Sequence, residues 1–136
     1  MYSSIVVAYD ESPGAEAALQ RAEGIATAFG GSLNLVRSVT DSALTEAAHP
    51  ETIAKARRQL QHEIDRFEPD LSGDLWVVGG PPATAILTAA EDVNADLIVA
   101  GSRHRGAIAR TLLGSVSSEL VHNAKCDVLI VTPDED

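Results

Sequence analysis

The sequence predicts an α/β fold, a doubly wound three-layer sandwich with a five-stranded parallel sheet in the order 3-2-1-4-5 and about four helices. Two observations lead to it: short apolar runs rich in β-branched residues, and amphipathic helical segments between them. Strands buried on both faces are continuous apolar runs, and parallel strands need a crossover, usually a helix. The 136 residues, 45% of them hydrophobic, are enough for one domain, which we expect to span residues 1–136.

The first strand and helix are predicted at the start of the chain. Residues 4–9 (SIVVAY) form a β-branched apolar run. Ser12 can cap the next helix, and Pro13 suits its first turn, where the missing N–H leaves no hydrogen bond unmade. The apolar residues of this helix recur at helical spacing until two glycines end it; they are Ala18, Ala22, Ile25, Ala26 and Phe29. We therefore expect this helix to cover one face of the sheet.

A second strand and a second helix follow. Residues 32–39 (SLNLVRSV) place Leu33 and Leu35 on one side of a strand, and residues 40–49 are expected to form an irregular connection. Pro50 opens the next helix and Pro69 stops it. Its apolar stripe recurs at steps of three or four and consists of Ile53, Ala56, Leu60, Ile64 and Phe67. This stripe indicates packing against the sheet.

The second half of the chain alternates in the same way. Strands are predicted at 75–78 (LWVV), 97–100 (LIVA) and 128–132 (VLIVT), with helices at 83–90 and 115–123. In a doubly wound sheet, ligands bind beyond the carboxyl ends of the strands, at the point where the winding reverses. The segments after the first and fourth strands are therefore the candidates for a functional site.

Composition argues against several classes of function. Lys and Arg total 10 against 20 Asp and Glu, and the net charge of -10 opposes attraction to nucleic acid or to a membrane surface. No apolar run reaches the roughly 18 residues of a membrane span, and a signal peptide is not recognisable, so we expect a cytoplasmic protein. Cys126 is the only cysteine, and the four histidines show no ligand spacing, so we expect no disulfide and no metal site.

A glycine-bearing segment follows the fourth strand. Gly101-Ser-Arg-His-Arg-Gly106 leads through seven residues to Gly114 and Ser115, which open a helix, and no acid stands between Gly101 and that helix. The GxxxxGK[ST] and GxGxxG fingerprints are both absent from the sequence. Glycines let backbone N–H groups approach phosphate oxygens, and a helix N-terminus directs unpaired amides and a positive dipole end at the same place. The segment therefore predicts an anion site.

This spacing resembles that of the universal stress protein family, in which a glycine, two residues, a second glycine and nine residues precede glycine and serine or threonine. Gly101, position 104, Gly114 and Ser115 fall on that spacing. An aspartate after the first strand, a Gly-Pro turn after the third, and the segments 95–102 and 126–133 also match. The resemblance covers nearly the whole chain and implies a stress-response role. It also implies a homodimer through the last strand, whose apolar edge proteins seldom leave open.

The resemblance further implies a site for ATP or a related adenine nucleotide, with Mg²⁺ bound only together with the nucleotide. The nucleotide-binding residues that it implies are Asp10, Ser38, Ala100, Gly101, His104, Gly114, Ser115, Val116 and Ser117. The loop glycines and the first amides of the last helix would contact phosphate, Asp10 would accept a bond from a ribose hydroxyl, and Ser38 would edge the adenine. No residue is assigned to catalysis, because neither lysine of the chain lies beside the loop, so we expect little or no hydrolysis.

One residue departs from the family pattern, since His104 stands in place of the second glycine. A side chain there projects where the pattern has none, although an imidazole can itself donate to phosphate. Three functions stay open: a regulatory nucleotide-binding module, a nucleotide-free homodimer acting through protein contacts, and a hydrolase with His104 as base. Asp10 and Ser115 also have a simpler role as helix caps, and Gly101 and Gly114 as tight turns.

Overall fold

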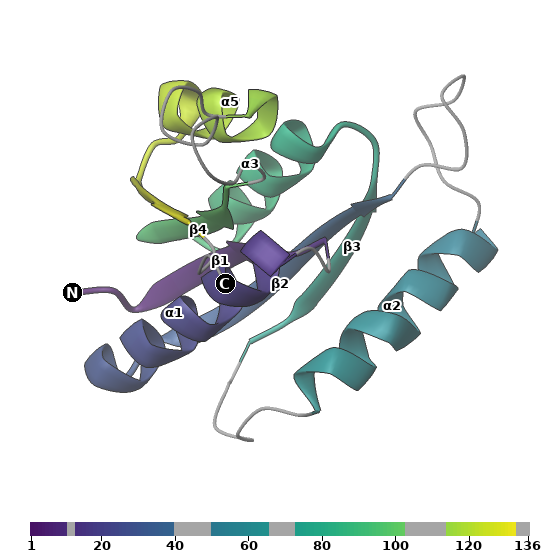
Figure 1. The fold of residues 1–136 in the computed structure, drawn as a ribbon, viewed down its shortest axis with the longest axis horizontal. Coiled ribbons are helices and arrows are strands. Elements are labelled where there is room, and N and C mark those ends of the chain that lie inside the picture. Colours follow the sequence, from purple (N-terminus) through teal and green to yellow (C-terminus); the bar gives the residue numbers. More distant parts are fainter. Residues whose placement is uncertain (11–12, 40–49, 66–72, 103–113, 133–136) are drawn as a thin grey trace.

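The computed structural model describes residues 1–10, 13–39, 50–65, 73–102 and 114–132. In these residues strands and helices alternate along the chain, as the sequence predicts (Figure 1). The strands are β1 (Ser4–Ala8), β2 (Ser32–Val39), β3 (Leu75–Gly79), β4 (Leu97–Gly101) and β5 (Asp127–Val131). The helices are α1 (Pro13–Phe29), α2 (Pro50–Ile64), α3 (Pro82–Asp92) and α5 (Ser115–Asn123). Predicted and observed boundaries differ by a few residues at most.

The strands form one parallel sheet in the order β3-β2-β1-β4-β5, which confirms the predicted order. Ile5 of β1 pairs with Leu33 of β2 on one side and with Leu97 of β4 on the other, so β1 lies at the centre. The chain adds β2 and β3 on one side of β1 and then crosses to add β4 and β5 on the other. The winding therefore reverses between β1 and β4, where ligands bind in sheets of this kind.

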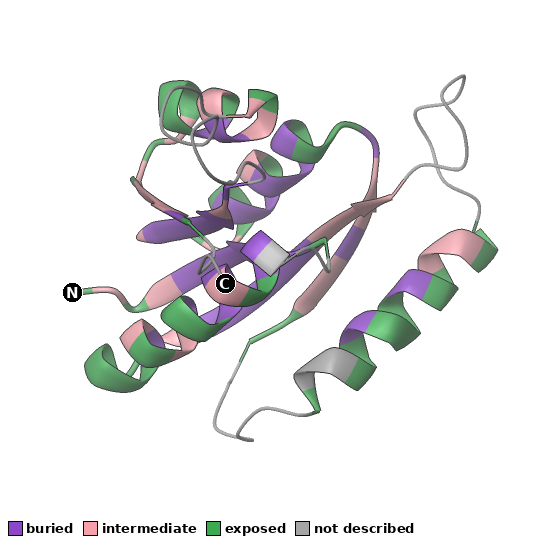
Figure 2. Ribbon diagram, in the orientation of Figure 1, coloured by how far each residue is buried: buried purple, intermediate pink, exposed green. Residues whose placement is uncertain are grey.

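Helices cover both faces of the sheet: α1 and α2 lie on one face, and α3 and α5 on the other (Figure 1). Alternate residues of each strand point to opposite faces, which gives two buried clusters. The cluster under α1 and α2 includes Ile5, Val7, Leu19, Leu35 and Leu60. The cluster under α3 and α5 includes Val6, Val36, Ile86, Ile98 and Leu120. In Figure 2 the buried residues follow the sheet and the inner sides of the helices.

The end of α1 follows from the glycine pair that the sequence places there. Gly30 has a φ of 68°, in the left-handed region that glycine enters without a Cβ clash. The Gly31 N–H donates to the Ala26 carbonyl at 2.9 Å, which closes a Schellman-type cap. Phe29 was predicted on the buried face of α1, but its side chain is 49% exposed. Phe29 is the last residue of α1, and its ring packs edge-on against Tyr2, with centroids 5.6 Å apart.

Several sequence predictions fall on other parts of the chain. The connection at 40–49, the helix cap at Ser12, and the predicted helix end at Phe67 and Pro69 lie outside the described residues. In the described residues α2 ends at Ile64.

At the amino end of the sheet, Asp96 ties the start of β1 to the turn before β4. Its Oδ2 accepts hydrogen bonds from the Ser3 hydroxyl (2.8 Å), the Ser4 N–H (3.0 Å) and the Ser3 N–H (2.9 Å). These bonds, led by that of the Ser3 hydroxyl, favour the charged carboxylate and lower the pKa of Asp96 below its ordinary value.

We expect Asp96→Asn to lower the free energy of unfolding at neutral pH. In acid, the free energy of unfolding of the variant should decrease less than that of the wild type. A carboxylate whose pKa is lower in the folded state contributes stability above its unfolded pKa of about 3.9, and that contribution is lost as the pH falls through the folded value. The gap between wild type and variant should therefore narrow below about pH 4. Urea denaturation as a function of pH measures this, with Asp92→Asn removing the same charge from the exposed end of α3 as the control. A gap that stays constant with pH would show that the Asp96 bonds contribute no pH-dependent stability.

Candidate functional site

A pocket opens at the carboxyl end of the sheet, at the reversal point between β1 and β4. Each predicted site residue that the structure describes lines it; they are Asp10, Ser38, Ala100, Gly101, Gly114, Ser115, Val116 and Ser117. His104 lies outside the described residues. The enclosed space is about 110 Å³, below the roughly 300–1,000 Å³ of pockets that bury a whole drug-sized ligand. A ligand as large as a nucleotide would therefore extend beyond the enclosed part.

Helix N-termini approach the pocket from both faces of the sheet. α5 begins at Ser115, and Ser117 in its first turn is only 5% exposed, while Ala15 in the first turn of α1 also lines the pocket. The first amides of a helix have no intrahelical carbonyl to bond, and the N-cap Gly114 supplies no side-chain acceptor for those of α5. Such amides, together with the positive end of the helix dipole, bind anions. The arrangement is therefore suited to a phosphate or carboxylate group.

Gly114 is not required to be glycine by its backbone or by its packing. Its φ of -67° and ψ of 166° are open to other residues. A Cβ built on it meets no described atom within 4 Å, so a side chain there would enter open space beside the pocket. The absence of a side chain at this position keeps the approach to the first amides of α5 open.

At position 101, unlike position 114, close packing requires a glycine. A Cβ on Gly101 would collide with the backbone of Gly14, and a Cβ on Gly14 would collide with the carbonyl of Ser102. The first turn of α1 and the end of β4 therefore touch backbone to backbone, which only a pair of glycines permits. This contact brings the N-terminus of α1 to the pocket, and Gly14 contributes to it although the sequence motif did not include that residue.

Ser38 has a structural bond as well as a place in the pocket. Its hydroxyl donates to the Gly80 carbonyl at 2.7 Å, and the Gly80 N–H donates to the Val39 carbonyl at 3.3 Å. Gly80 has a φ of 113°, which strongly favours glycine. The Ser38 hydroxyl proton is thus used to hold the turn after β3 against the end of β2, and only the remaining surface of Ser38 faces the pocket.

The charge lining the pocket is limited. Among the described lining residues Asp10 is the only Asp, Glu, Lys, Arg or His, and its carboxylate lies exposed at the rim. The described residues contain no cluster of three or more metal-ligating His, Cys, Asp or Glu side chains. In the same part of the chain, no helix is both long and apolar enough to cross a membrane. Among the described lining residues, the groups able to attract an anion are therefore backbone amides and not side-chain cations.

Sequence reasoning missed several residues of the pocket wall, namely Ala8, Tyr9, Ala15, Val36, Pro82 and Ile86. Five of them belong to strands or helices that the sequence predicts, and Pro82 directly precedes the helix predicted at 83–90. The helical spacing of Ile86 gave no sign that the start of α3 faces the ends of β1 and β2. Only the tertiary arrangement supplies that information.

The structure defines a doubly wound α/β protein with an amide-lined pocket at its switch point, and comparison with known proteins specifies the family. The model of the universal stress protein family matches residues 1–132. A universal stress protein of Thermus aquaticus is 36% identical over 96% of this chain and 99% of its own length. The chain belongs to the universal stress protein family, which confirms the resemblance seen in the sequence.

Two solved structures of the family contain adenine nucleotides. One universal stress protein in complex with cAMP is 29% identical, with a TM-score of 0.71 over 98% of this chain and 98% of its own. The universal stress protein of Archaeoglobus fulgidus in complex with dAMP is 28% identical, with a TM-score of 0.70 over 96% of this chain and 98% of its own. These relatives are similar to this chain over nearly their whole length.

Proposed function

We propose that this protein is a stress-response regulator that binds ATP or a related adenine nucleotide in the pocket between β1, β4 and α5, with little or no hydrolysis. The observation that carries the proposal is Gly114, where a side chain is absent although neither backbone conformation nor described packing requires its absence. An opening next to unpaired helix amides suits a phosphate group. The complexes of relatives with cAMP and dAMP support adenine as the base.

In this proposal, the amides of Ser115, Val116 and Ser117 hold the phosphate, and Gly101 and Gly114 let it approach. Asp10, exposed at the rim of the pocket, accepts a hydrogen bond from a ribose hydroxyl, and Ser38 at the end of β2 edges the adenine. Ala100 contributes to the pocket floor. Mg²⁺ binds only with the nucleotide, through the phosphates and water, since Asp10 is the only carboxylate among the described lining residues.

Little or no hydrolysis is part of the same proposal, and the sequence supports it because neither Lys55 nor Lys125 lies beside the glycine loop. Phosphoryl transfer requires cations or a metal to stabilise the charge of the transition state, and a base to position water. Among the described lining residues there is no lysine, arginine or histidine. A bound nucleotide would therefore act by its presence, as a switch between conformations or partners, with at most weak ATPase activity.

Thermal melting tests this function. A ligand at 100 times its dissociation constant adds about 2.7 kcal/mol, which raises the midpoint of a domain of this size by about 10 °C. We expect such a shift with millimolar Mg-ATP and none with Mg²⁺ alone. An unchanged midpoint would contradict the proposal.

A nucleotide-free homodimer acting through protein contacts is the second candidate, favoured by His104 and by the small enclosed volume of the pocket. His104→Gly separates the two. If the side chain is the obstacle to binding, this variant should show the Mg-ATP shift that the wild type lacks. If neither protein shifts, the remaining pocket does not suit a nucleotide.

We also propose a cytoplasmic homodimer through β5. Val128, Leu129 and Ile130 are half-buried, and β5 is an edge strand that pairs only with β4 among the described residues. Pairing with a second copy would cover this apolar edge. The free thiol of Cys126 suits a reducing compartment. Light scattering at micromolar concentration should give the mass of two 14.3 kDa chains, and a monomeric mass would contradict the dimer.

A further inference from the structure

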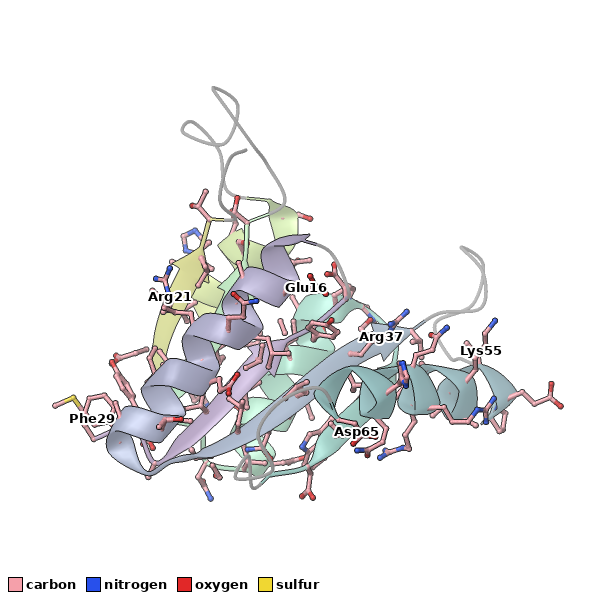
Figure 3. The ribbon with its side chains drawn as sticks, turned by 60° about the horizontal axis from the view of Figure 1, so that its bottom comes forward. Glu16, Arg21, Phe29, Arg37, Lys55 and Asp65 are labelled. Carbon is pink, nitrogen blue, oxygen red and sulfur yellow. The ribbon has the colours of Figure 1, made fainter. Side chains whose placement is uncertain are left out.

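The outer face of α2 carries a stripe of basic residues. Lys55, Arg58 and His62 follow one another at steps of three and four, whereas Arg57 lies about 100° around the helix from Arg58, at the edge of the packed face. All four side chains are exposed. The apolar face of the helix packs on β2 and β3, and Lys55, Arg58 and His62, which we call the α2 basic stripe, lie on the side away from the sheet. Figure 2 shows exposed residues along the outer side of α2. Figure 3 shows Lys55 projecting from α2, and Asp65 just beyond the opposite end of that helix.

Lys55 and Arg58 of the stripe, and the neighbouring Arg57, are not neutralised within the described part of the chain. No described carboxylate forms an ion pair with Lys55, Arg57 or Arg58. By contrast, Lys125 pairs with Glu91 at 3.1 Å although both side chains are largely exposed. Asp65, just past the helix, accepts a hydrogen bond from Gln61 Nε2 at 2.9 Å instead of pairing with an arginine of the stripe.

This concentration of charge is unusual for the chain and unfavourable for the helix. Acids outnumber Lys and Arg 20 to 10 overall, yet Lys55, Arg57 and Arg58 stand within four consecutive residues, and no acid occurs between Glu51 and Glu63. Like charges three or four residues apart on a helix repel one another, and solvated helices usually mix both signs. Lys55 and Arg58 therefore repel each other, and a partner that neutralises them explains their placement better than solubility, which the net charge of -10 already provides.

We propose that the α2 basic stripe is a docking surface for a short acidic segment of a partner protein. Charge complementarity favours this occupant, because a short segment meets the local positive field without meeting the rest of the acidic surface. A nucleic acid fits less well, since its affinity comes from many phosphate contacts along an extended polyanion. A membrane fits less well, because the apolar face that would enter the lipid is already packed on the sheet. The stripe lies on the opposite side of the sheet from α5, so the inference does not depend on nucleotide binding (Figure 1).

Fluorescence anisotropy with a labelled octaglutamate peptide tests the proposal on the full chain. Binding is measured at about 10 mM salt, where the Debye length is about 30 Å, and again at about 150 mM, where it is about 8 Å. Lys55→Gln/Arg58→Gln is compared with Arg21→Gln/Lys125→Gln, which removes the same two charges from α1 and from the turn before β5. Lys55→Arg/Arg58→Lys keeps the charges in place, and circular dichroism checks that each variant folds.

We expect wild type to bind the peptide, with affinity falling as salt is added. The stripe variant should bind about tenfold more weakly, and both the matched-charge variant and the charge-preserving variant should stay within about twofold of wild type. Three results would overturn the proposal: no binding by wild type at low salt, equal weakening in the two charge-removing variants, or tighter binding of a labelled octathymidylate that also requires the stripe. The last result would assign the surface to nucleic acid.

Discussion

Gly14→Ala is expected to lower the free energy of unfolding by about 2–3 kcal/mol, although it adds only a single methyl group. The added Cβ would meet the carbonyl oxygen of Ser102, which belongs to the backbone and cannot turn aside as a flexible side chain does. Either the first turn of α1 or the end of β4 must move. Urea denaturation followed by circular dichroism measures the loss.

Gly24→Ala is the matched control, because it makes the same change in the same helix. A Cβ on Gly24 meets no described atom within 4 Å, and alanine is about 0.8–1 kcal/mol more favourable than glycine in a helix. We therefore expect Gly24→Ala to be more stable than wild type. If Gly14→Ala were as stable as Gly24→Ala, the backbone contact between α1 and β4 would not have the importance that we give it.

Gly114→Ala is expected to weaken adenine nucleotide binding by about tenfold or more, a loss of about 1.4 kcal/mol, while leaving the fold intact. The methyl group would occupy the space that a phosphate needs to reach the amides of Ser115 and Val116. Stability should change by no more than about 1 kcal/mol, because the poorer N-cap is offset by the lower entropy of the unfolded chain. Calorimetric titration with Mg-ATP measures the affinity, and urea denaturation measures the stability.

The two glycine variants at the pocket thus have opposite expected profiles. Gly114→Ala should lose affinity for the nucleotide with little change in the free energy of unfolding, whereas Gly14→Ala should have a lower free energy of unfolding. Gly24→Ala should bind like wild type. A Gly114→Ala protein with undiminished affinity would mean that the ligand does not pass the start of α5.

The layers of the fold could be predicted from the sequence because each element carries its own local signal. The apolar run at residues 4–9 indicated a strand buried on both faces, and the Gly30-Gly31 pair marked the end of α1. The boundaries of α5 were predicted correctly because Gly114 and Ser115 are typical of a helix start. Where the signal was only periodicity, the prediction was less accurate: Phe29 continues the apolar spacing of α1 but lies half exposed against Tyr2.

The candidate site was predictable only as far as its motif extends along the chain. Gly101 and Gly114 stand out in the sequence. The sequence does not show that Gly101 is needed for a backbone contact, whereas Gly114 borders open space. The contact between Gly14 and Gly101 joins residues from the first and fourth βα units, and the bond from Ser38 to Gly80 joins the ends of two strands. Such contacts depend on strand register and on how the loops meet at the end of the sheet, which local residue patterns do not encode.

In the proposed function, backbone amides at the start of α5 receive the phosphate of an adenine nucleotide. The most direct test is a titration of the ¹⁵N-labelled protein with Mg-ATP, followed through the amide resonances. We predict that the largest shifts fall on the amides of Gly101 and of residues 114–117, with smaller shifts near Asp10 and Ser38. Amides of 114–117 that stay unchanged at millimolar nucleotide, or shifts confined to another part of the protein, would contradict the account.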